Sequence, residues 1–271
     1  MPEATDTRLS SEVVDRLGEA LFEAFESGAA IEPLTATNPE MGVADAYRVQ
    51  RSLLDRHAGA GRRPAGHKIG LTSRAIQQQL GVTSPDFGVV LDSHVFLSGT
   101  TVSRSELRMV APRIEAEVAF LLDHELRGPG VTAQDVSRST RALVPVFELI
   151  DSRIRDWRIT LADTIADNAS CLGAVVGAQV APVDVGDVAS LSVSFGRNGT
   201  VLERGEATAV MGNPATAVAW LANELAALGE SLPAGKPVLS GSFTAAVDAT
   251  PGCYEASFGD RLGTVSIQIV A

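Results

Sequence analysis

The 271-residue sequence is poor in the residues that mark several common classes of protein. Its two cysteines, Cys171 and Cys253, are too few for a disulfide framework, and no CxxC pair is present. We expect both to be small buried side chains of a protein in a reducing cytoplasm. The four histidines are scattered without the spacing of metal ligands: His57, His67, His94 and His124.

Motifs that bind nucleotides or catalytic zinc are also missing. The sequence contains no GxGxxG segment after a strand, no Walker A loop and no HExxH. A dinucleotide enzyme, a nucleotide hydrolase and a zinc protease therefore all lack their usual sequence evidence.

Positive charge and long apolar runs are scarce. The formal net charge is -11, which argues against binding to nucleic acid or to anionic membranes. The best apolar run, Cys171 to Val183, is too short for a membrane span and is broken by Gly173, Gly177 and Pro182. The N-terminus has no basic segment followed by an apolar stretch, as a secretory signal would have. We expect a cytoplasmic protein.

The composition is that of an ordinary globular chain, with 45% hydrophobic and 20% charged residues. No low-complexity segment or internal repeat divides it, so we expect one domain over residues 1–271. Apolar residues at helical spacing predict helices over about Ser11 to Ser27 and Val43 to His57, with a short third helix over about Ser73 to Leu80. The N-terminal part, about 1–65, should therefore be helical.

The rest of the chain, about 66–271, turns towards strands. Strands are predicted at Val89–Phe96, Arg113–Leu122, Val144–Ile150, Leu191–Phe195, Thr200–Arg204, Pro237–Ser240, Tyr254–Phe258 and Thr264–Val270. Asn198-Gly199 is a strong hairpin signal, and a helix is expected over about Pro214 to Leu228. Helices and strands do not alternate regularly, so the fold class is α+β.

The clearest candidate for chemistry is the segment RIEAEVAF, Arg113 to Phe120. Side chains of a strand alternate between two faces, so Glu115 and Glu117 share the face opposite the apolar residues. Two like charges on one face repel each other unless a cation lies between them. The spacing is therefore typical of either a divalent-metal site or a solvated strand face.

A third carboxylate, Glu148, lies within the apolar strand Val144 to Ile150. A buried carboxylate needs a partner, whereas an outward position on an edge strand, which Pro145 would permit, needs none. Joined to Glu115 and Glu117, Glu148 would complete an all-oxygen site. Such a site suits a hard ion such as Mg²⁺ or Mn²⁺ and not zinc.

Two further charged residues lie in apolar, turn-rich surroundings. Lys68, in GHKIGLTS, is either an ordinary surface lysine or a confined one that could transfer protons. Asp86, in SPDFG, follows a proline, and an aspartate in that position is commonly a turn residue.

Two polar segments separate apolar ones: Ile150 to Trp157 and Asp163 to Cys171. They are interpreted either as structured loops held by Asp–Arg pairs or as direct contacts to a substrate, and the residues alone leave both open.

Taken together, these motifs resemble the 2-keto-4-pentenoate (2-hydroxypenta-2,4-dienoate) hydratases of the fumarylacetoacetate hydrolase superfamily. The segments that carry the resemblance are GHKIGLTS, QQQLGV with PDFG, PRIEAEVAF, FELIDSRIRDW and ADTIADNASC. It extends from about Lys68 to Cys171 and continues more weakly through GNPATAVAWLAN and LGTVS.

The resemblance implies an α+β fold with a mixed β-roll or barrel-like, metal-binding core and N-terminal helices. It implies Mg²⁺ or Mn²⁺ as cofactor and three groups of site residues: the metal ligands Glu115, Glu117 and Glu148, the proton-transfer residues Lys68 and Asp86, and the substrate-binding residues Leu71 and Ser170.

The implied reaction is metal-dependent hydration of 2-hydroxypenta-2,4-dienoate or a close analogue to 4-hydroxy-2-oxopentanoate. Such a step belongs to the meta-cleavage catabolism of aromatic or steroid compounds. The resemblance also implies a homo-oligomer, and an association with an aldolase or decarboxylase of the same pathway.

Two alternatives stay open at this point. SGSFTAA, residues 240–246, continues as expected of the sister 4-oxalocrotonate decarboxylases, whose dicarboxylate substrate would need an extra cation such as Arg74 or Arg155. The PDFG turn and the DWRI and ADTIADNASC segments favour the hydratase. A non-catalytic partner subunit is the alternative of another class, but it would have no need to keep mutually repelling carboxylates.

Overall fold

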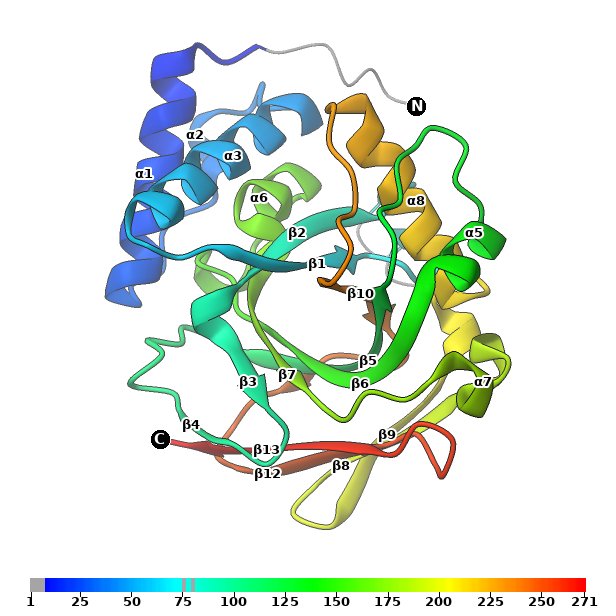
Figure 1. The fold of residues 1–271 in the computed structure, drawn as a ribbon. Helices are drawn as coiled ribbons and strands as arrows, with labels where there is room; N and C mark the ends of the chain where they lie inside the picture. Colours follow the sequence, from blue (N-terminus) through cyan, green and yellow to red (C-terminus); the bar gives the residue numbers. More distant parts are fainter. Residues whose placement is uncertain (1–7, 75–76, 79–80) are drawn as a thin grey trace.

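Helices open the chain and a curled β structure follows (Figure 1). The computed structural model describes residues 8–74, 77–78 and 81–271. Helices α1 (Ser11–Ser27), α2 (Leu34–Thr37) and α3 (Val43–Gly59) form the N-terminal part, which confirms the two helices predicted there. The helix expected over about Ser73 to Leu80 lies partly outside the described residues.

Helix α1 shows why this part is helical. The Ser10 hydroxyl accepts a hydrogen bond from the Val13 N–H at 3.3 Å and caps its first turn, while Gly28 ends it with a left-handed φ of 69°. Leu17 and Leu21 recur at helical spacing and are buried against α3.

The large sheet is mixed and strongly curled. Its strands follow the spatial order β2-β1-β10-β5-β6-β7-β3, with β11 paired to β5. The strands are β1 (Pro64–Gly70), β2 (Asp86–Leu91), β3 (Val95–Leu97), β5 (Arg113–Leu122), β6 (Thr140–Ile150), β7 (Cys171–Val176), β10 (Pro237–Ser242) and β11 (Val247–Asp248). The curl brings β2 close to β7, so the sheet nearly closes on itself, as Figure 1 shows. This arrangement confirms the predicted α+β class with a barrel-like core.

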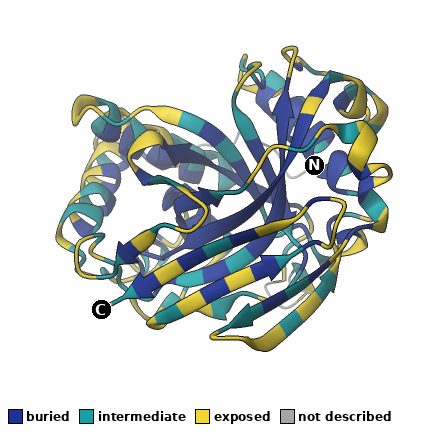
Figure 2. Ribbon diagram, turned by 60° about the horizontal axis from the view of Figure 1, so that its bottom comes forward, coloured by how far each residue is buried: buried dark blue, intermediate teal, exposed yellow. Residues whose placement is uncertain are grey.

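A second, antiparallel-rich sheet packs beneath the first. It comprises β4 (Thr101–Ser103), β8 (Ser192–Arg197), β9 (Thr200–Glu206), β12 (Gly252–Ser257) and β13 (Thr264–Val270). Along β13, Val265, Ile267 and Ile269 are buried while Thr264 and Gln268 are exposed, which gives the alternating stripes of Figure 2. The hairpin predicted from Asn198-Gly199 joins β8 to β9, and both turn residues have positive φ.

Shorter helices cover the flanks of the large sheet. They are α5 (Ala133–Ser139), α6 (Leu161–Ala166), α7 (Pro182–Val185) and α8 (Pro214–Ala227). The Asn213 side chain accepts a hydrogen bond from Ala215 N–H at 2.9 Å and Pro214 occupies the first turn of α8, so this helix begins where the sequence predicts. None of the helices in the described ranges combines the length and the apolar character needed to cross a bilayer.

Some expectations were wrong. Val89–Phe96 is not one strand, because the Asp92 carboxylate accepts hydrogen bonds from the Arg63 and Ser93 N–H groups and starts a 3₁₀ turn that separates β2 from β3. Cys171 is buried as expected, but Cys253 is exposed, because it lies on the outward face of β12.

An aromatic and imidazole cluster joins the N-terminal helices to the core. The His57 ring lies edge-on to Phe25, with 4.7 Å between the ring centroids, and Phe25 lies edge-on to His94, with 5.3 Å between the centroids. Burial, together with the positive charge of Arg62, lowers the pKa of His57 to about 3 and that of His94 to about 4. Arg62 Nε donates to His57 Nδ1 at 3.0 Å, so the imidazole is held in its neutral form.

We expect the free energy of unfolding to fall as the pH is lowered from about 6.5 towards 4. Below pH about 6.5 the unfolded chain protonates these imidazoles, but the folded chain does not, so protons favour unfolding. Each imidazole should account for a loss of about 1 kcal/mol per pH unit. Urea unfolding, repeated between about pH 7.5 and about pH 5.5, gives the free energy of unfolding at each pH. Plotted against pH, this free energy should change less steeply for His94→Asn than for the wild type.

The matched control is His124→Asn, because the side chain of His124 is 76% exposed. It should keep the wild-type slope. Equal slopes for all three proteins would contradict this account of the helix–core junction.

Candidate metal centre

Three glutamates converge inside the curl of the large sheet. Glu115 and Glu117 point to the same face of β5, and the antiparallel register places Glu148 of β6 directly opposite Glu115. One carboxylate oxygen from each of the three lies within 4.8 Å of the others. Glu117 and Glu148 are fully buried and Glu115 is half-buried, and we call these three residues the acidic cluster. The edge-strand alternative for Glu148 is wrong, because β6 lies between β5 and β7.

Few hydrogen-bond donors reach the carboxylate oxygens of the acidic cluster within the described residues. Glu117 Oε2 accepts the N–H of Gly241 at 2.8 Å, but Glu117 Oε1 and Glu148 Oε2 have no partner within the described part of the chain, and the partner of Glu148 Oε1 is the Lys68 ammonium group at 3.3 Å. Buried carboxylate oxygens are costly without a donor or a cation. Three converging oxygen ligands fit a hard divalent ion such as Mg²⁺ or Mn²⁺.

Electrostatics support the same interpretation. Burial raises the pKa of Glu117 well above its usual value, and the charges of Glu148 and Glu115 raise it further. Burial also raises the pKa of Glu148 to about 8, although the Lys68 charge opposes that shift. Without a cation the acidic cluster therefore retains protons that a bound cation would replace.

Lys68 lies inside the site and not on the surface. It is 4% exposed, and its Nζ donates to the carbonyl oxygen of Ala169 at 2.8 Å and lies 3.3 Å from Glu148 Oε1. Burial alone favours the neutral amine, but the charges of Glu148 and Asp86 outweigh it and raise the pKa of Lys68 above its usual value. Lys68 is therefore an ammonium group beside the acidic cluster.

Asp86 approaches the same place from β2. It pairs with Gly70 of β1, is fully buried, and accepts no hydrogen bond at Oδ1 within the described residues. Burial raises the pKa of Asp86, and the Lys68 charge opposes that shift. A Cβ atom on Gly70 would lie 2.2 Å from Asp86 Oδ1 and 2.9 Å from Lys68 Nζ, so glycine is required for the two groups to converge.

Leu71 and Ser170 border these groups in strained backbone. Leu71 directly follows Gly70 and has a φ of 57°. Asn168, Ala169 and Ser170 form three consecutive non-glycine residues with φ between 51° and 55°, and we call them the 168–170 turn. The Ser170 hydroxyl is 3.3 Å from that of Thr164 and is buried.

The polar segments combine loop structure with support of the site. The expected Asp–Arg pairing is found between Arg153 and Asp167, both buried. Sequence reasoning missed Gly241 and the carbonyl of Ala169, because these residues contribute backbone groups that residue type does not reveal.

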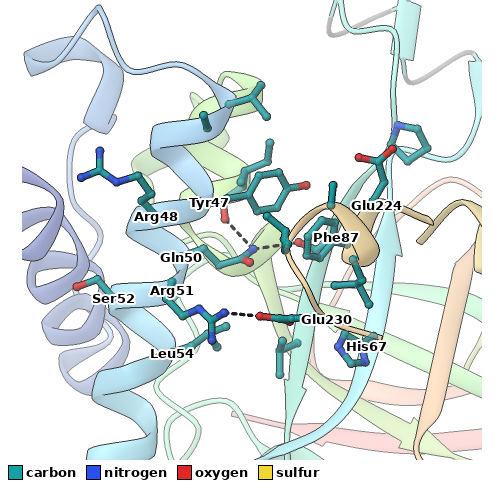
Figure 3. Close-up of a pocket in the computed structure, with 18 of the residues that line it drawn as sticks. Tyr47, Arg48, Gln50, Arg51, Ser52, Leu54, His67, Phe87, Glu224 and Glu230 are labelled. Atoms are coloured by element: carbon teal, nitrogen blue, oxygen red, sulfur yellow. Dashed lines mark hydrogen bonds and ion pairs between the residues drawn. The ribbon is translucent and has the colours of Figure 1, made fainter. Parts of the chain in front are cut away.

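A separate cavity of about 1560 Å³ lies on the other face of β1 and β2, between α3 and α8 (Figure 3). Phe87 stacks on Tyr47 there, with 4.5 Å between the ring centroids. His67 faces the cavity, and Arg51 forms an ion pair with Glu230 across it. Because strand side chains alternate, His67 and Phe87 line this cavity while their neighbours Lys68 and Asp86 face the acidic cluster. The cavity and the candidate metal centre are therefore different places.

The fold and the site together define a candidate metal enzyme of the α+β class, with acid–base groups beside the metal site. Residues 60–268 match the family model described as fumarylacetoacetate (FAA) hydrolase C-terminal. The chain belongs to the fumarylacetoacetate hydrolase family.

Individual relatives are similar over most of their length. The chain is 42% identical to a 2-hydroxyhexa-2,4-dienoate hydratase of Comamonas testosteroni, covering 94% of this chain and 97% of that protein. It is 43% identical to a 2-hydroxypent-2,4-dienoate hydratase of Pseudomonas putida, covering 80% and 97%. Among solved structures, the 4-oxalocrotonate decarboxylase from Pseudomonas putida G7, complexed with magnesium and adipate, matches with a TM-score of 0.93 and 35% identity over 98% of this chain and 100% of that one.

Gly70→Ala should lower the free energy of unfolding by about 1–3 kcal/mol, because the new methyl group displaces Asp86 and Lys68 from a filled site. Urea unfolding measures the loss. Gly59→Ala is the matched control: Gly59 ends α3 with open space around its Cβ position, so stability should stay level or rise by about 1 kcal/mol at most. A loss as large for Gly59→Ala as for Gly70→Ala would show that crowding at the site is not the cause.

Proposed function

We propose that the protein is a hydro-lyase that adds water to 2-hydroxypenta-2,4-dienoate, or a close analogue, to give 4-hydroxy-2-oxopentanoate. The observation that carries the proposal is the convergence of the buried acidic cluster with Lys68 and Asp86 in one place. That convergence occurs in a chain that is 42% and 43% identical to relatives named as dienoate hydratases.

We assign Mg²⁺ or Mn²⁺ to the acidic cluster, with Glu115, Glu117 and Glu148 as ligands. The oxygen-only ligand set and the carboxylate oxygens without donors support this assignment. When bound, such an ion supplies Lewis-acid chemistry, drawing electron density from the 2-oxygen of the substrate.

The protein's own acid–base groups carry the proton transfers. In the proposed reaction the 2-hydroxyl group loses its proton and C5 gains one, which gives the conjugated 2-keto-3-enoate. The oxygen of water then bonds to C4 and a proton goes to C3, so one water is added overall. We assign proton delivery and water activation jointly to Lys68 and Asp86, which are buried and adjacent. Leu71 and Ser170 are proposed to contact the substrate.

The organisation of the chain belongs to the same proposal. We propose a single catalytic domain over residues 1–271, because the N-terminal helices brace the core: the Thr35 hydroxyl and N–H both bond to the Asp163 carboxylate, which caps α6. We also propose a cytoplasmic homo-oligomer that acts on a small 2-keto acid and associates with an aldolase or decarboxylase of its pathway.

A decarboxylase of 2-oxohex-3-enedioate is the second candidate, favoured by the solved decarboxylase that matches along nearly the whole chain. Such an enzyme would need a cation for the second carboxylate of its substrate. Arg155 is instead paired with Glu32 on the surface, and Arg74 is exposed. These placements favour the hydratase.

An absorbance assay with freshly generated 2-hydroxypenta-2,4-dienoate, with and without Mg²⁺ or Mn²⁺, tests the proposal. Metal-dependent loss of the dienoate with formation of 4-hydroxy-2-oxopentanoate is the expected result. Release of CO₂ from the dicarboxylate without hydration of the dienoate would transfer the assignment to the decarboxylase. Inactivity towards both substrates would favour the alternative of a non-catalytic partner subunit.

Glu117→Gln should abolish binding of Mn²⁺ yet stabilise the metal-free protein. Because burial raises the pKa of Glu117, the folded metal-free chain keeps a proton there near neutral pH that the unfolded chain releases, which costs stability. The neutral amide has no such cost, so it should raise the free energy of unfolding. Thermal unfolding with a chelator should therefore show a higher Tm for the variant.

Saturating Mn²⁺, at about 100 times Kd, should add about 3 kcal/mol to the wild type and nothing to Glu117→Gln. Glu255→Gln, an exposed glutamate on β12, is the control and should behave as the wild type does. An undiminished gain from Mn²⁺ in Glu117→Gln would remove Glu117 from the ligand set.

A further inference from the structure

Arg153 is buried directly behind the turn that contacts Lys68. It is 3% exposed. Its guanidinium donates from Nη1 to the carbonyl oxygen of Asp151 at 2.6 Å, from Nη2 to the carbonyl oxygen of Asp167 at 2.6 Å, and from Nε to Asp167 Oδ1 at 2.5 Å. The N–H of Arg153 also donates to Asp167 Oδ2 at 2.9 Å. Nη1 also donates to the carbonyl oxygen of Cys171 at 3.4 Å, so one side chain bonds to the residues on both sides of the 168–170 turn.

The 168–170 turn needs such support, because its backbone is unfavourable. Three consecutive non-glycine residues adopt left-handed φ values, and structures keep such residues only where the surroundings determine them. The Asn168 amide bonds to both the N–H and the carbonyl of Val89, each at 2.8 Å. The Ser170 carbonyl accepts the Asp151 N–H at 2.9 Å. The turn is thus tied to β2 on one side and to the loop of Arg153 on the other.

Within the described residues, one hydrogen bond joins the turn to Lys68. Its middle residue, Ala169, offers the carbonyl oxygen that accepts the Lys68 Nζ hydrogen bond at 2.8 Å. With Glu148 Oε1 at 3.3 Å, this carbonyl fixes two directions around the ammonium group. If the turn relaxed to negative φ values, the Ala169 carbonyl would point elsewhere. Lys68 Nζ would then lose the hydrogen bond that orients it, while the acidic cluster would stay in place.

We propose that Arg153 is a positioning residue for the proton transfers of Lys68, acting by holding the 168–170 turn in its left-handed form. This inference rests on the proposed function, since it concerns the same site. Arg153 touches none of the reacting groups itself, so it should govern the rate of the chemical steps and not the binding of metal.

Arg153→Lys isolates this role. Lysine keeps the charge opposite Asp167, but its single ammonium group cannot replace a planar fork that reaches two carbonyls and a carboxylate at once. Arg155→Lys is the matched control from the same loop, because Arg155 is 53% exposed and pairs with Glu32 at the surface.

The test combines steady-state hydration of 2-hydroxypenta-2,4-dienoate, Mn²⁺ titration and hydrogen exchange. For Arg153→Lys we expect kcat to fall by about 10- to 100-fold, as for a small misplacement of a reacting group, with the Kd for Mn²⁺ within about threefold of the wild type. KM should rise as well, because Ser170 of the same turn is proposed to contact the substrate. Peptides that cover residues 86–91 and 149–152 should exchange faster, because the Val89 and Asp151 N–H groups bond to the turn. Arg155→Lys should match the wild type in every measurement.

Faster exchange in Arg153→Lys with an unchanged kcat would overturn the positioning role, and so would a parallel loss of Mn²⁺ binding. If the wild type hydrated nothing, the proposed function would fail, and unchanged exchange in Arg153→Lys would then also refute the hold on the turn. Should Arg153→Lys not fold, Asn168→Asp, which loses its donor to the Val89 carbonyl, must show the same loss of kcat with the binding of Mn²⁺ retained.

Discussion

The rest of the site depends on one electrostatic constraint: the three carboxylates of the acidic cluster, two of them fully buried, share a sheet interior with a fourth, that of Asp86, and with the ammonium group of Lys68. Like charges this close cannot all ionise in an apolar interior without further positive charge. We propose that a divalent cation supplies that charge, so that the acidic cluster lowers stability without the ion and serves the reaction with it. The strands β5 and β6 provide the rigid frame, since their register fixes the spacing of the glutamates.

Backbone exceptions bring the remaining groups to this frame. Gly70 leaves room for Asp86 and Lys68 to converge, and the left-handed 168–170 turn presents a carbonyl to Lys68. The left-handed turn lowers stability locally in exchange for this placement, as strained functional sites commonly do. The N-terminal part supports the same region, because Ile31, between α1 and α2, forms backbone hydrogen bonds with Arg153 and Arg155, close to the turn.

Periodic features of the sequence predicted a good part of this structure. Helix α1 and strand β5 follow from apolar spacing, and the period of two is enough to predict that Glu115 and Glu117 share one face. The position of Glu148 could not be decided, because burial depends on which strands flank β6, a non-local property. The break between β2 and β3 and the 168–170 turn were missed, because they depend on side-chain hydrogen bonds to distant backbone. The residues alone left Lys68 open between a surface lysine and a proton-transfer group, and only the resemblance to a family of hydratases favoured proton transfer for Lys68 and gave Asp86 that role.

Anomalous X-ray scattering at the manganese edge, from crystals grown with Mn²⁺, tests the central claim most directly. The account predicts one strong peak among Glu115, Glu117 and Glu148, with a carboxylate oxygen of each about 2.0–2.2 Å from it, as is usual for small divalent ions. Ordered crystals with no peak at the acidic cluster, or with a peak only elsewhere, would contradict it.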